Sequence, residues 1–142
     1  MKKILLTGST GFIGSALLGN LSKNNKIYIT VRKKNKISLK NKNISKIYFD
    51  DYDKLNKKLK KIKVNTVIHC ATHYVKKHNY DDLKKLSNAN ILFGNIILEN
   101  LEVMNVKKFI NFSTVWTNYN GVRGNFFNLY SVYKENFNNI IK

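Results

Sequence analysis

The sequence lacks proline, has a single cysteine and contains no apolar run of about 18 residues that could cross a membrane. One cysteine excludes an intrachain disulfide, and the place of Cys70 inside the apolar run 67–71 predicts a buried, small hydrophobic side chain. The three histidines have no partner cysteines at ligand spacing, so we expect no metal site. Because there is no basic-then-apolar leader either, we expect a soluble, cytoplasmic protein that does not act at a membrane.

Acidic residues are scarce as well: 8 stand against 26 basic residues, which gives a net charge of +18 over 142 residues. Such an excess is typical of nucleic-acid binding. However, only Arg32 and Arg123 are arginines, the lysines are spread along the chain among many asparagines, and no recognition motif accompanies them. We interpret the excess as solvated lysine faces and a compositional drift toward Lys and Asn, and attraction of a phosphate-bearing ligand is a secondary effect. No nucleic-acid partner is expected.

The length fits one domain, and strand-like and helix-like segments alternate along it. Short apolar or β-branched runs predict strands, and the stretches between them have helical spacing. This alternation implies right-handed crossovers and an α/β fold, a doubly wound parallel sheet with helices on both faces. The predicted strands are 3–7, 26–31, 45–49, 64–70 and 107–112, and the predicted helices are 12–23, 53–61 and 81–105.

Two later segments extend this pattern. The helix around 83–104 is apolar on more than one face, so it needs a partner besides the sheet, and a helix-to-helix dimer contact is one candidate. Residues 126–142 also show a helical period. A parallel domain normally continues with another strand after such a helix. We therefore interpret the chain as the front part of something longer.

A glycine-rich turn follows the first predicted strand. Residues 7–15 read TGSTGFIGS, with Gly8, Gly11 and Gly14 at three-residue spacing between an apolar run and a helical pattern. A strand that enters a helix through such a turn aims backbone N–H groups and the positive end of the helix dipole at one point. Gly8 permits a tight turn, Gly11 lets phosphates approach the backbone, and Gly14 allows close packing of helix on strand. The turn predicts nucleotide binding.

Tyr130 and Lys134 form a Y-x-x-x-K pattern, which puts both side chains on one face of the last predicted helix. An ammonium beside a phenol favours the phenolate, so we expect the pKa of Tyr130 to be lowered from about 10 toward a range useful for acid or base catalysis. Thr114 follows strand 107–112, at the carboxyl edge where open α/β sheets bind ligands. The alternatives are an amphipathic helix whose tyrosine packs and whose lysine is solvated, and a capping or strand-end threonine.

Further segments follow one another in a recognisable order: TGSTGFIG at 7–14, FDDYD at 49–53, TVIHCAT at 66–72, NILFGNIIL at 90–98, FINFST at 109–114 and YSVYK at 130–134. Together they resemble the extended short-chain dehydrogenase/reductase family, the NAD(P)-dependent epimerase/dehydratase group, which acts largely on nucleotide sugars. The stretch STVWTNYNG followed by NLYSVYK also resembles a branch of sugar-nucleotide 4-ketoreductases. The resemblance implies a Rossmann-like fold truncated before the C-terminal substrate-binding part, with residues 1–142 as one incomplete NAD(P)-binding domain.

The resemblance also implies roles for individual residues. Thr114, Tyr130 and Lys134 would form the catalytic group. Asp51 would contact the adenine, and Lys134 would also bond the nicotinamide ribose. The implied cofactor-binding residues are Gly8, Thr10, Gly11, Phe12, Ile13 and Gly14 at the pyrophosphate, Arg32, Asp51 and Tyr52 at the adenosine end, Cys70, Ala71 and Thr72 on the ribose and nicotinamide side, and Tyr130 and Lys134.

The end of the second predicted strand bears on the choice of cofactor. An acidic residue there would accept both hydroxyls of the NAD adenosine ribose. The chain has Arg32, Lys33 and Lys34 instead, and a guanidinium followed by ammonium groups suits a 2′-phosphate. The sequence therefore favours NADP, with NAD as the alternative.

The residues after Thr114 bear on the reaction. Family dehydratases place an Asp-Glu pair there, whereas this chain has Val115 and Trp116, so dehydration is disfavoured. The leading hypothesis is reduction or 4-epimerisation of a nucleotide sugar, with a homodimer formed through the 83–104 and 126–142 helices. We expect the isolated chain to turn over poorly or not at all. The alternatives are a noncatalytic dinucleotide-binding module or truncated gene product, and a nucleic-acid binder whose retention on DNA or RNA would be salt-sensitive.

Overall fold

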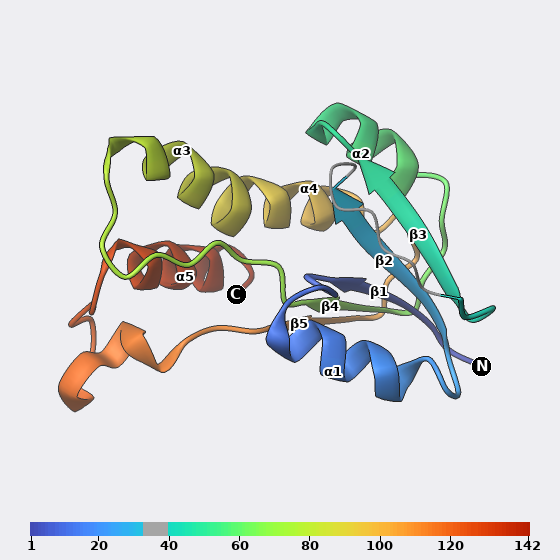
Figure 1. The fold of residues 1–142 in the computed structure, drawn as a ribbon, viewed down its shortest axis with the longest axis horizontal. Helices are drawn as coiled ribbons and strands as arrows, with labels where there is room; N and C mark the ends of the chain where they lie inside the picture. The colour runs from blue at the N-terminus through green and yellow to red at the C-terminus, as the bar shows by residue number, and fades with distance from the viewer. Residues whose placement is uncertain (33–39) are drawn as a thin grey trace. The chain divides into compact units, whose positions relative to one another are not determined.

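The computed structural model describes residues 1–32 and 40–142. Within these residues it contains a parallel sheet of five strands in the order β3-β2-β1-β4-β5 (Figure 1). The strand order reverses between β1 and β4, as in a doubly wound α/β fold. The predicted fold class is confirmed. The strands are β1 (Lys3–Thr7), β2 (Lys26–Arg32), β3 (Ile44–Phe49), β4 (Thr66–His69) and β5 (Lys108–Asn111).

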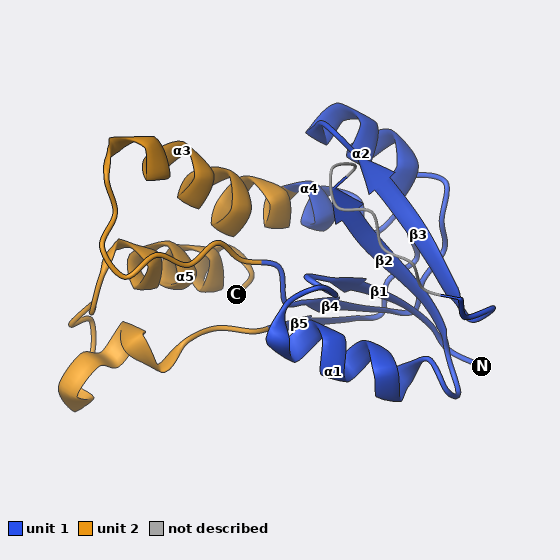
Figure 2. Cartoon of the chain, viewed as in Figure 1, with its two compact units in different colours: residues 1–71, 96–111 blue, residues 72–95, 112–142 orange. Residues whose placement is uncertain are grey.

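The chain divides into two compact units, coloured separately in Figure 2. Unit 1 comprises residues 1–71 and 96–111 and contains the whole sheet. Unit 2 comprises residues 72–95 and 112–142 and is largely helical. Each unit has its own candidate residues, so the two are described separately.

The core of unit 1 follows from the strand sequences. Leu5, Ile27 and Val67 are fully buried and come from three adjacent strands. Because successive side chains point to opposite faces of a sheet, uniformly apolar strands need helices on both faces. Figure 1 shows α1 (Phe12–Leu21) and α2 (Tyr52–Leu59) on opposite faces of this sheet.

The helix predicted over 81–105 consists of several segments. The structure contains α3 (Tyr80–Ser87), a π-helical turn η1 (Asn88–Leu92) and α4 (Phe93–Glu99), after which residues 100–105 form turns. A π-helical turn is wider than an α-helical one and is often found at functional sites. The prediction of one continuous helix was therefore wrong in its detail.

The last helix, α5 (Leu129–Ile140), is shorter than the predicted segment 126–142. It begins after Asn128, whose Oδ1 accepts the amide of Ser131 at 3.0 Å while Ser131 Oγ accepts the amide of Asn128 at 3.2 Å. This reciprocal capping box fixes the helix start. Within unit 2, α5 packs closely on α4, because a Cβ at Gly94 would lie 2.3 Å from Cζ of Phe137.

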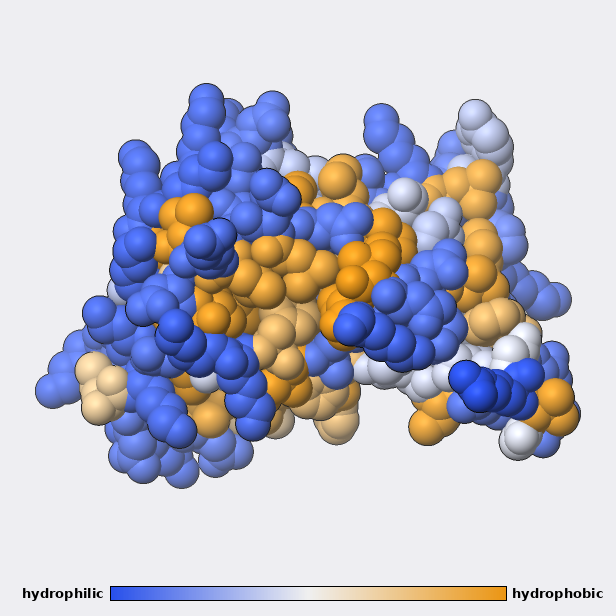
Figure 3. Space-filling model, turned by 180° about the vertical axis from the view of Figure 1, so that it is seen from behind, coloured by the Kyte–Doolittle hydropathy of each residue, from blue (hydrophilic) through white to orange (hydrophobic). Residues whose placement is uncertain are grey.

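The described lysines are mostly on the surface, and Lys134 is the one among them that is buried. Hydrophilic side chains cover much of the face in Figure 3, with hydrophobic side chains visible between them. Among the described residues, no helix has the length and apolar character needed to span a membrane.

Candidate functional site

The glycine turn of unit 1 has a backbone that other residues cannot reproduce. Gly8 has φ +69°, and a Cβ there would lie 2.6 Å from the amide nitrogen of Ala71. A Cβ at Gly14 would lie 2.1 Å from the carbonyl oxygen of Gly8. Both distances are far inside van der Waals contact, so the strand, the turn and the first turn of α1 need glycine at these positions. A close approach at Gly14 is present, but it is against Gly8 and Ser9 of the turn and not against the strand itself.

The N-terminus of α1 carries no counter-charge of its own. Its N-cap is Gly11, which has no side chain to accept the first helical N–H groups, and the first turn has no acidic residue. Thr10, Phe12 and Ile13 are exposed around it, Phe12 with 95% of its surface accessible. Ser9 is buried, and its Oγ has no hydrogen-bond partner among residues 1–32 and 40–142. Free N–H groups and a positive helix end fit a phosphate group.

Two buried polar residues that were not predicted from the sequence hold this turn against the end of β4. Thr7 Oγ1 lies 2.9 Å from Nδ1 of His69 and accepts the amide of Ala71 at 3.1 Å. The direction of the bond between Thr7 Oγ1 and Nδ1 is set by the tautomer of His69, because a hydroxyl can donate one proton and accept two. A polar residue at the end of each of two apolar strands was the available signal.

Cys70 and Ala71 follow directly after β4. Cys70 is half-buried, so the prediction of a buried hydrophobe was wrong. The reason is that β4 ends at His69, and the chain leaves the sheet there beside Gly8. Both residues thus lie next to the glycine turn.

The residues predicted for the adenosine end gather at the carboxyl ends of β2 and β3. Arg32 is paired in register with Phe49, and the Phe49 ring stacks on Tyr52 with centroids 6.2 Å apart. Burial raises the pKa of Tyr52, and the Arg32 cation offsets part of that shift. Arg32 is exposed. The predicted Lys33 and Lys34 lie outside the described residues.

Asp51 has a structural role in this region. Its Oδ1 accepts the amide of Lys54 at 2.7 Å, which caps α2, and its Oδ2 lies 3.1 Å from the Lys54 ammonium. The carboxylate also stabilises the positive N-terminus of the helix. Its contact with an adenine remains a prediction.

Unit 2 contains the predicted catalytic group. Tyr130 and Lys134 lie one turn apart on α5, and both are buried, with 9% and 3% of their surfaces accessible. Thr114 is half-buried at the N-cap of the 3₁₀ helix η2 (Val115–Gly121), where its Oγ1 accepts the amide of Trp116 at 3.3 Å. Thr114 is therefore a capping residue, which was one of the alternatives that the sequence left open.

The pKa of Tyr130 is raised, so the expectation that it would be lowered was wrong. Burial is the main cause, and the neighbouring Tyr74 raises it further. A hydrogen bond with Thr72 lowers it in part. Burial disfavours a phenolate because the charged form loses its hydration. At neutral pH this phenol is therefore protonated.

Thr72 is held in place by Asn90, which the sequence analysis did not single out. Asn90 is buried in the π-helical turn η1. Its Oδ1 accepts the Thr72 hydroxyl at 2.6 Å and the His73 amide at 2.9 Å, and its Nδ2 donates to the His73 carbonyl at 2.9 Å. This set fixes which end of the amide is oxygen. Asn90 thereby positions the hydroxyl that bonds Tyr130.

Aromatic rings surround Tyr130 within unit 2. The ring of Tyr74 meets that of Tyr130 edge-on at 5.2 Å, and Trp116 does so at 6.3 Å. Trp116 also lies 5.3 Å from Tyr74 and 5.2 Å from Phe127. These rings exclude water from one side of the phenol, which accounts for the burial of Tyr130.

The described residues contain no group of three or more His, Cys, Asp or Glu side chains that could hold a metal ion.

The sequence profile of the NAD dependent epimerase/dehydratase family matches residues 4–126. The chain belongs to this family. Family members bind NAD(P). No curated protein is significantly similar to the chain in sequence.

Solved structures agree with the fold. The chain is similar to the epimerase Mth375 of Methanothermobacter thermautotrophicus, with 27% identity and a TM-score of 0.69 over 80% of this chain and 35% of that one. A UDP-glucose 4-epimerase gives a TM-score of 0.81 at 19% identity over 98% of this chain and 46% of that one. The enzyme WbmH of Bordetella bronchiseptica, solved in complex with NAD⁺, gives 0.77 at 20% identity over 98% of this chain and 51% of that one. The chain thus spans about a third to half of the length of these three proteins.

Proposed function

We propose that this chain is the coenzyme-binding part of an NADP-dependent enzyme that reduces or epimerises C4 of a nucleotide-linked sugar. The observation that carries the proposal is the buried Tyr130, paired with Lys134 on one helix face and bonded to Thr72. The glycine turn supports it, because a cradle that a Cβ at Gly8 or Gly14 would fill suits a pyrophosphate. Family membership is consistent with both.

The chemistry of the proposal follows from the state of Tyr130. A bound nicotinamide would supply or accept the hydride at the sugar carbon. Tyr130 would give its proton to the carbonyl oxygen, which suits a phenol whose pKa is raised and which is protonated at neutral pH. Thr114 would donate a second hydrogen bond to the same oxygen, and Lys134 would bond the coenzyme ribose. Val115 and Trp116 offer no carboxylate for dehydration.

Coenzyme binding tests the proposal without requiring turnover. Titration of the chain with NADPH, followed by coenzyme fluorescence, is expected to show saturable binding. Titration with NADH is expected to show weaker binding, because the exposed Arg32 guanidinium can bond a 2′-phosphate that only NADPH carries. No saturable binding of either coenzyme would refute the proposal.

The preference for NADP has its own test. Arg32→Asp is expected to reverse the ratio of NADPH to NADH affinity, because a carboxylate repels the 2′-phosphate and accepts ribose hydroxyls. Arg123→Asp is the matched control, since it changes the only other arginine and alters the net charge equally. An unchanged ratio in Arg32→Asp would leave only the coarser assignment, NAD(P).

The assembly is part of the same proposal. The chain would dimerise through the 83–104 and 126–142 regions, and it would need a substrate-binding part beyond residues 1–142 for full activity. Exposed apolar side chains on these helices, Leu92 at 42% and Ile140 at 50%, support the contact. Analytical ultracentrifugation would be expected to give twice the monomer mass, and Leu92→Glu to restore the monomer. A monomer at all concentrations would contradict this part alone.

A noncatalytic dinucleotide-binding module is the second candidate. The glycine turn of unit 1 would serve such a module without any role for Tyr130. Tyr130→Phe separates the two. In an enzyme, the rate of sugar reduction would fall about 100- to 10,000-fold because the general acid is lost. In a binding module, the coenzyme affinity would be unchanged.

A further inference from the structure

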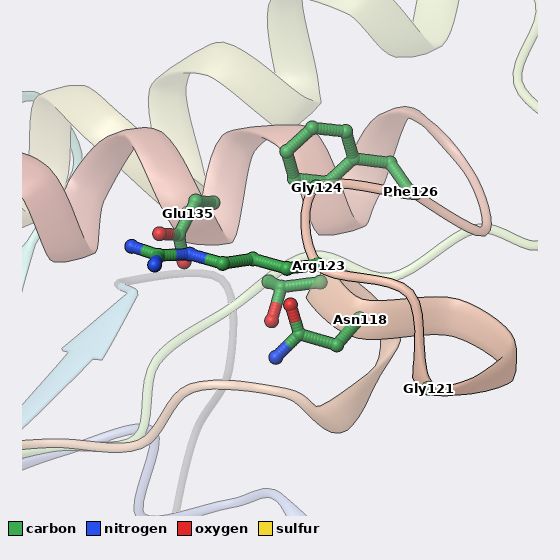
Figure 4. Close-up of a pocket in the computed structure, with 7 residues that line it drawn as sticks. Asn118, Gly121, Arg123, Gly124, Phe126 and Glu135 are labelled. Carbon is green, nitrogen blue, oxygen red and sulfur yellow. The ribbon is translucent and has the colours of Figure 1, made fainter.

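Unit 2 holds a polar pocket that the proposed reaction does not use. Its volume is about 360 Å³, and it lies between the end of η2, the loop that follows it and α5. Figure 4 shows Arg123 extended across it toward Glu135, with Asn118 beside them and Phe126 along one wall. Pockets of this size hold a monosaccharide or a similar small molecule.

The pocket is distinct from the Tyr130 site on the same helix. Glu135 follows Tyr130 by five residues, which places it about 140° further around α5. Tyr130 and Lys134 are buried, whereas Glu135 is half-buried and lines the pocket. The pocket therefore opens on another face of α5 and needs neither the catalytic group nor a coenzyme.

The charged groups of the pocket have unused bonding capacity. In the described part of the chain, the guanidinium of Arg123 and the side-chain amide of Asn118 make no hydrogen bond or ion pair. Among the same residues, Glu135 Oε2 accepts a bond from Asn138 at 3.1 Å, and Glu135 Oε1 has only the ammonium of Lys142, at 4.0 Å. The five N–H donors of the Arg123 guanidinium thus lie near Glu135 Oε1, which accepts no hydrogen bond from the described residues.

This combination selects among ligands. An inorganic anion would be attracted by Arg123 but repelled by Glu135, and an apolar ligand would leave both charges desolvated. A sugar hydroxyl accepts a hydrogen bond from Arg123 and donates one to Glu135, so a vicinal diol satisfies both. Phe126, 37% accessible, offers an apolar face to the C–H side of the ring. We propose that this pocket binds a pyranose ring, and this site goes beyond the proposed reduction.

The sugar could come from a nucleotide sugar or from a free saccharide. Titrations of the ¹⁵N-labelled chain with glucose, UDP-glucose and UDP distinguish these sources. The amides of Gly121 and Gly124 and the Nε–H of Arg123 report on the pocket. Saturable shifts of these signals with glucose and UDP-glucose are expected, and UDP alone should not move them. A response to UDP-glucose without one to glucose would assign the pocket to the nucleotide-linked sugar.

Two variants test the contacts. Arg123→Ala and the isosteric Glu135→Gln are each expected to weaken sugar binding about tenfold or more, because each removes a hydrogen bond to a charged group. Lys84→Ala, which removes an exposed cation on α3, is the control and should bind as before. Dispersed amide signals in the NMR spectrum of each variant would show that it is folded. If Arg123→Ala does not fold, the isosteric Glu135→Gln still tests the pocket.

Three results would overturn the pocket proposal: no saturable shift with either sugar, the same shifts with UDP, or unchanged affinity in both variants. Binding of NADPH is measured separately for each variant and should stay constant. Failure of the unaltered chain to bind NADPH would count against the proposed function and not against this pocket.

Discussion

Asn90 and Thr72 are joined by a hydrogen bond of 2.6 Å between Oδ1 and Oγ1, although 18 residues separate them. Asn90→Ala would remove this bond and leave the backbone N–H and C=O of His73 without their partners. A buried polar group left unpaired costs about 1–3 kcal/mol. Urea unfolding is expected to show a loss of that order. Asn20→Ala, at an exposed position of α1, should change the free energy of unfolding little.

The same contact bears on the phenol of Tyr130. Thr72→Val keeps the side-chain shape but removes the hydroxyl that bonds Tyr130, while the burial that mainly raises the pKa of Tyr130 stays, so that pKa should remain above its ordinary value. Phenolate absorbance, measured against pH and corrected with Tyr130→Phe for the other tyrosines, would report the pKa of Tyr130 in the variant. A Tyr130 pKa at or below that of free tyrosine in Thr72→Val would contradict burial as the main cause.

Stability at alkaline pH depends on two tyrosines. The pKa values of Tyr52 and Tyr130 are both raised in the folded chain, mainly by burial. Above pH 10 the unfolded chain loses these protons while the folded chain keeps them, so the free energy of unfolding should fall as pH rises. Below pH 10 these two groups should have no effect. Denaturant unfolding of the chain and of Tyr130→Phe across this range would show a smaller alkaline loss in the variant.

Two glycines of α1 provide a matched pair. Gly14→Ala places a Cβ 2.1 Å from the Gly8 carbonyl oxygen and should cost about 1–3 kcal/mol or more, as overpacking does. A Cβ at Gly19 has no described neighbour within 4 Å, so Gly19→Ala should stabilise the chain by about 0.5–1 kcal/mol, because alanine favours a helix. Thermal unfolding should show opposite shifts in midpoint. Equal shifts would argue against the close contact in the turn.

The strands of the sheet could be predicted because each one is determined mainly by its own short stretch of sequence. Each strand is a short apolar run, and the five predicted strands overlap those of the structure. Element ends were less predictable, since they depend on particular bonds. The capping box between Asn128 and Ser131 starts α5 later than its apolar pattern does, and the π-helical turn around Asn90 interrupts a pattern that reads as one helix.

The environment of Tyr130 could not be predicted from spacing. Y-x-x-x-K placed Lys134 beside the phenol, but the direction of the pKa shift comes from burial and from Tyr74, which lies 56 positions earlier in the chain. Asn90 gave only a weak signal, a polar residue among apolar ones in NILFGNIIL. Its partners, Thr72 and His73, lie 18 and 17 positions earlier, before α3, and only the folded chain brings them together.

Thr7 bonds both His69 and the amide of Ala71, so the exit of β1 and the exit of β4 are tied through one hydroxyl. A ligand that tightens the loop over residues 8–14 should therefore slow solvent exchange of the Ala71 amide without touching it. This slowing of exchange would depend on Thr7 Oγ1 alone. In Thr7→Val, a ligand at residues 8–14 should therefore no longer slow exchange of the Ala71 amide.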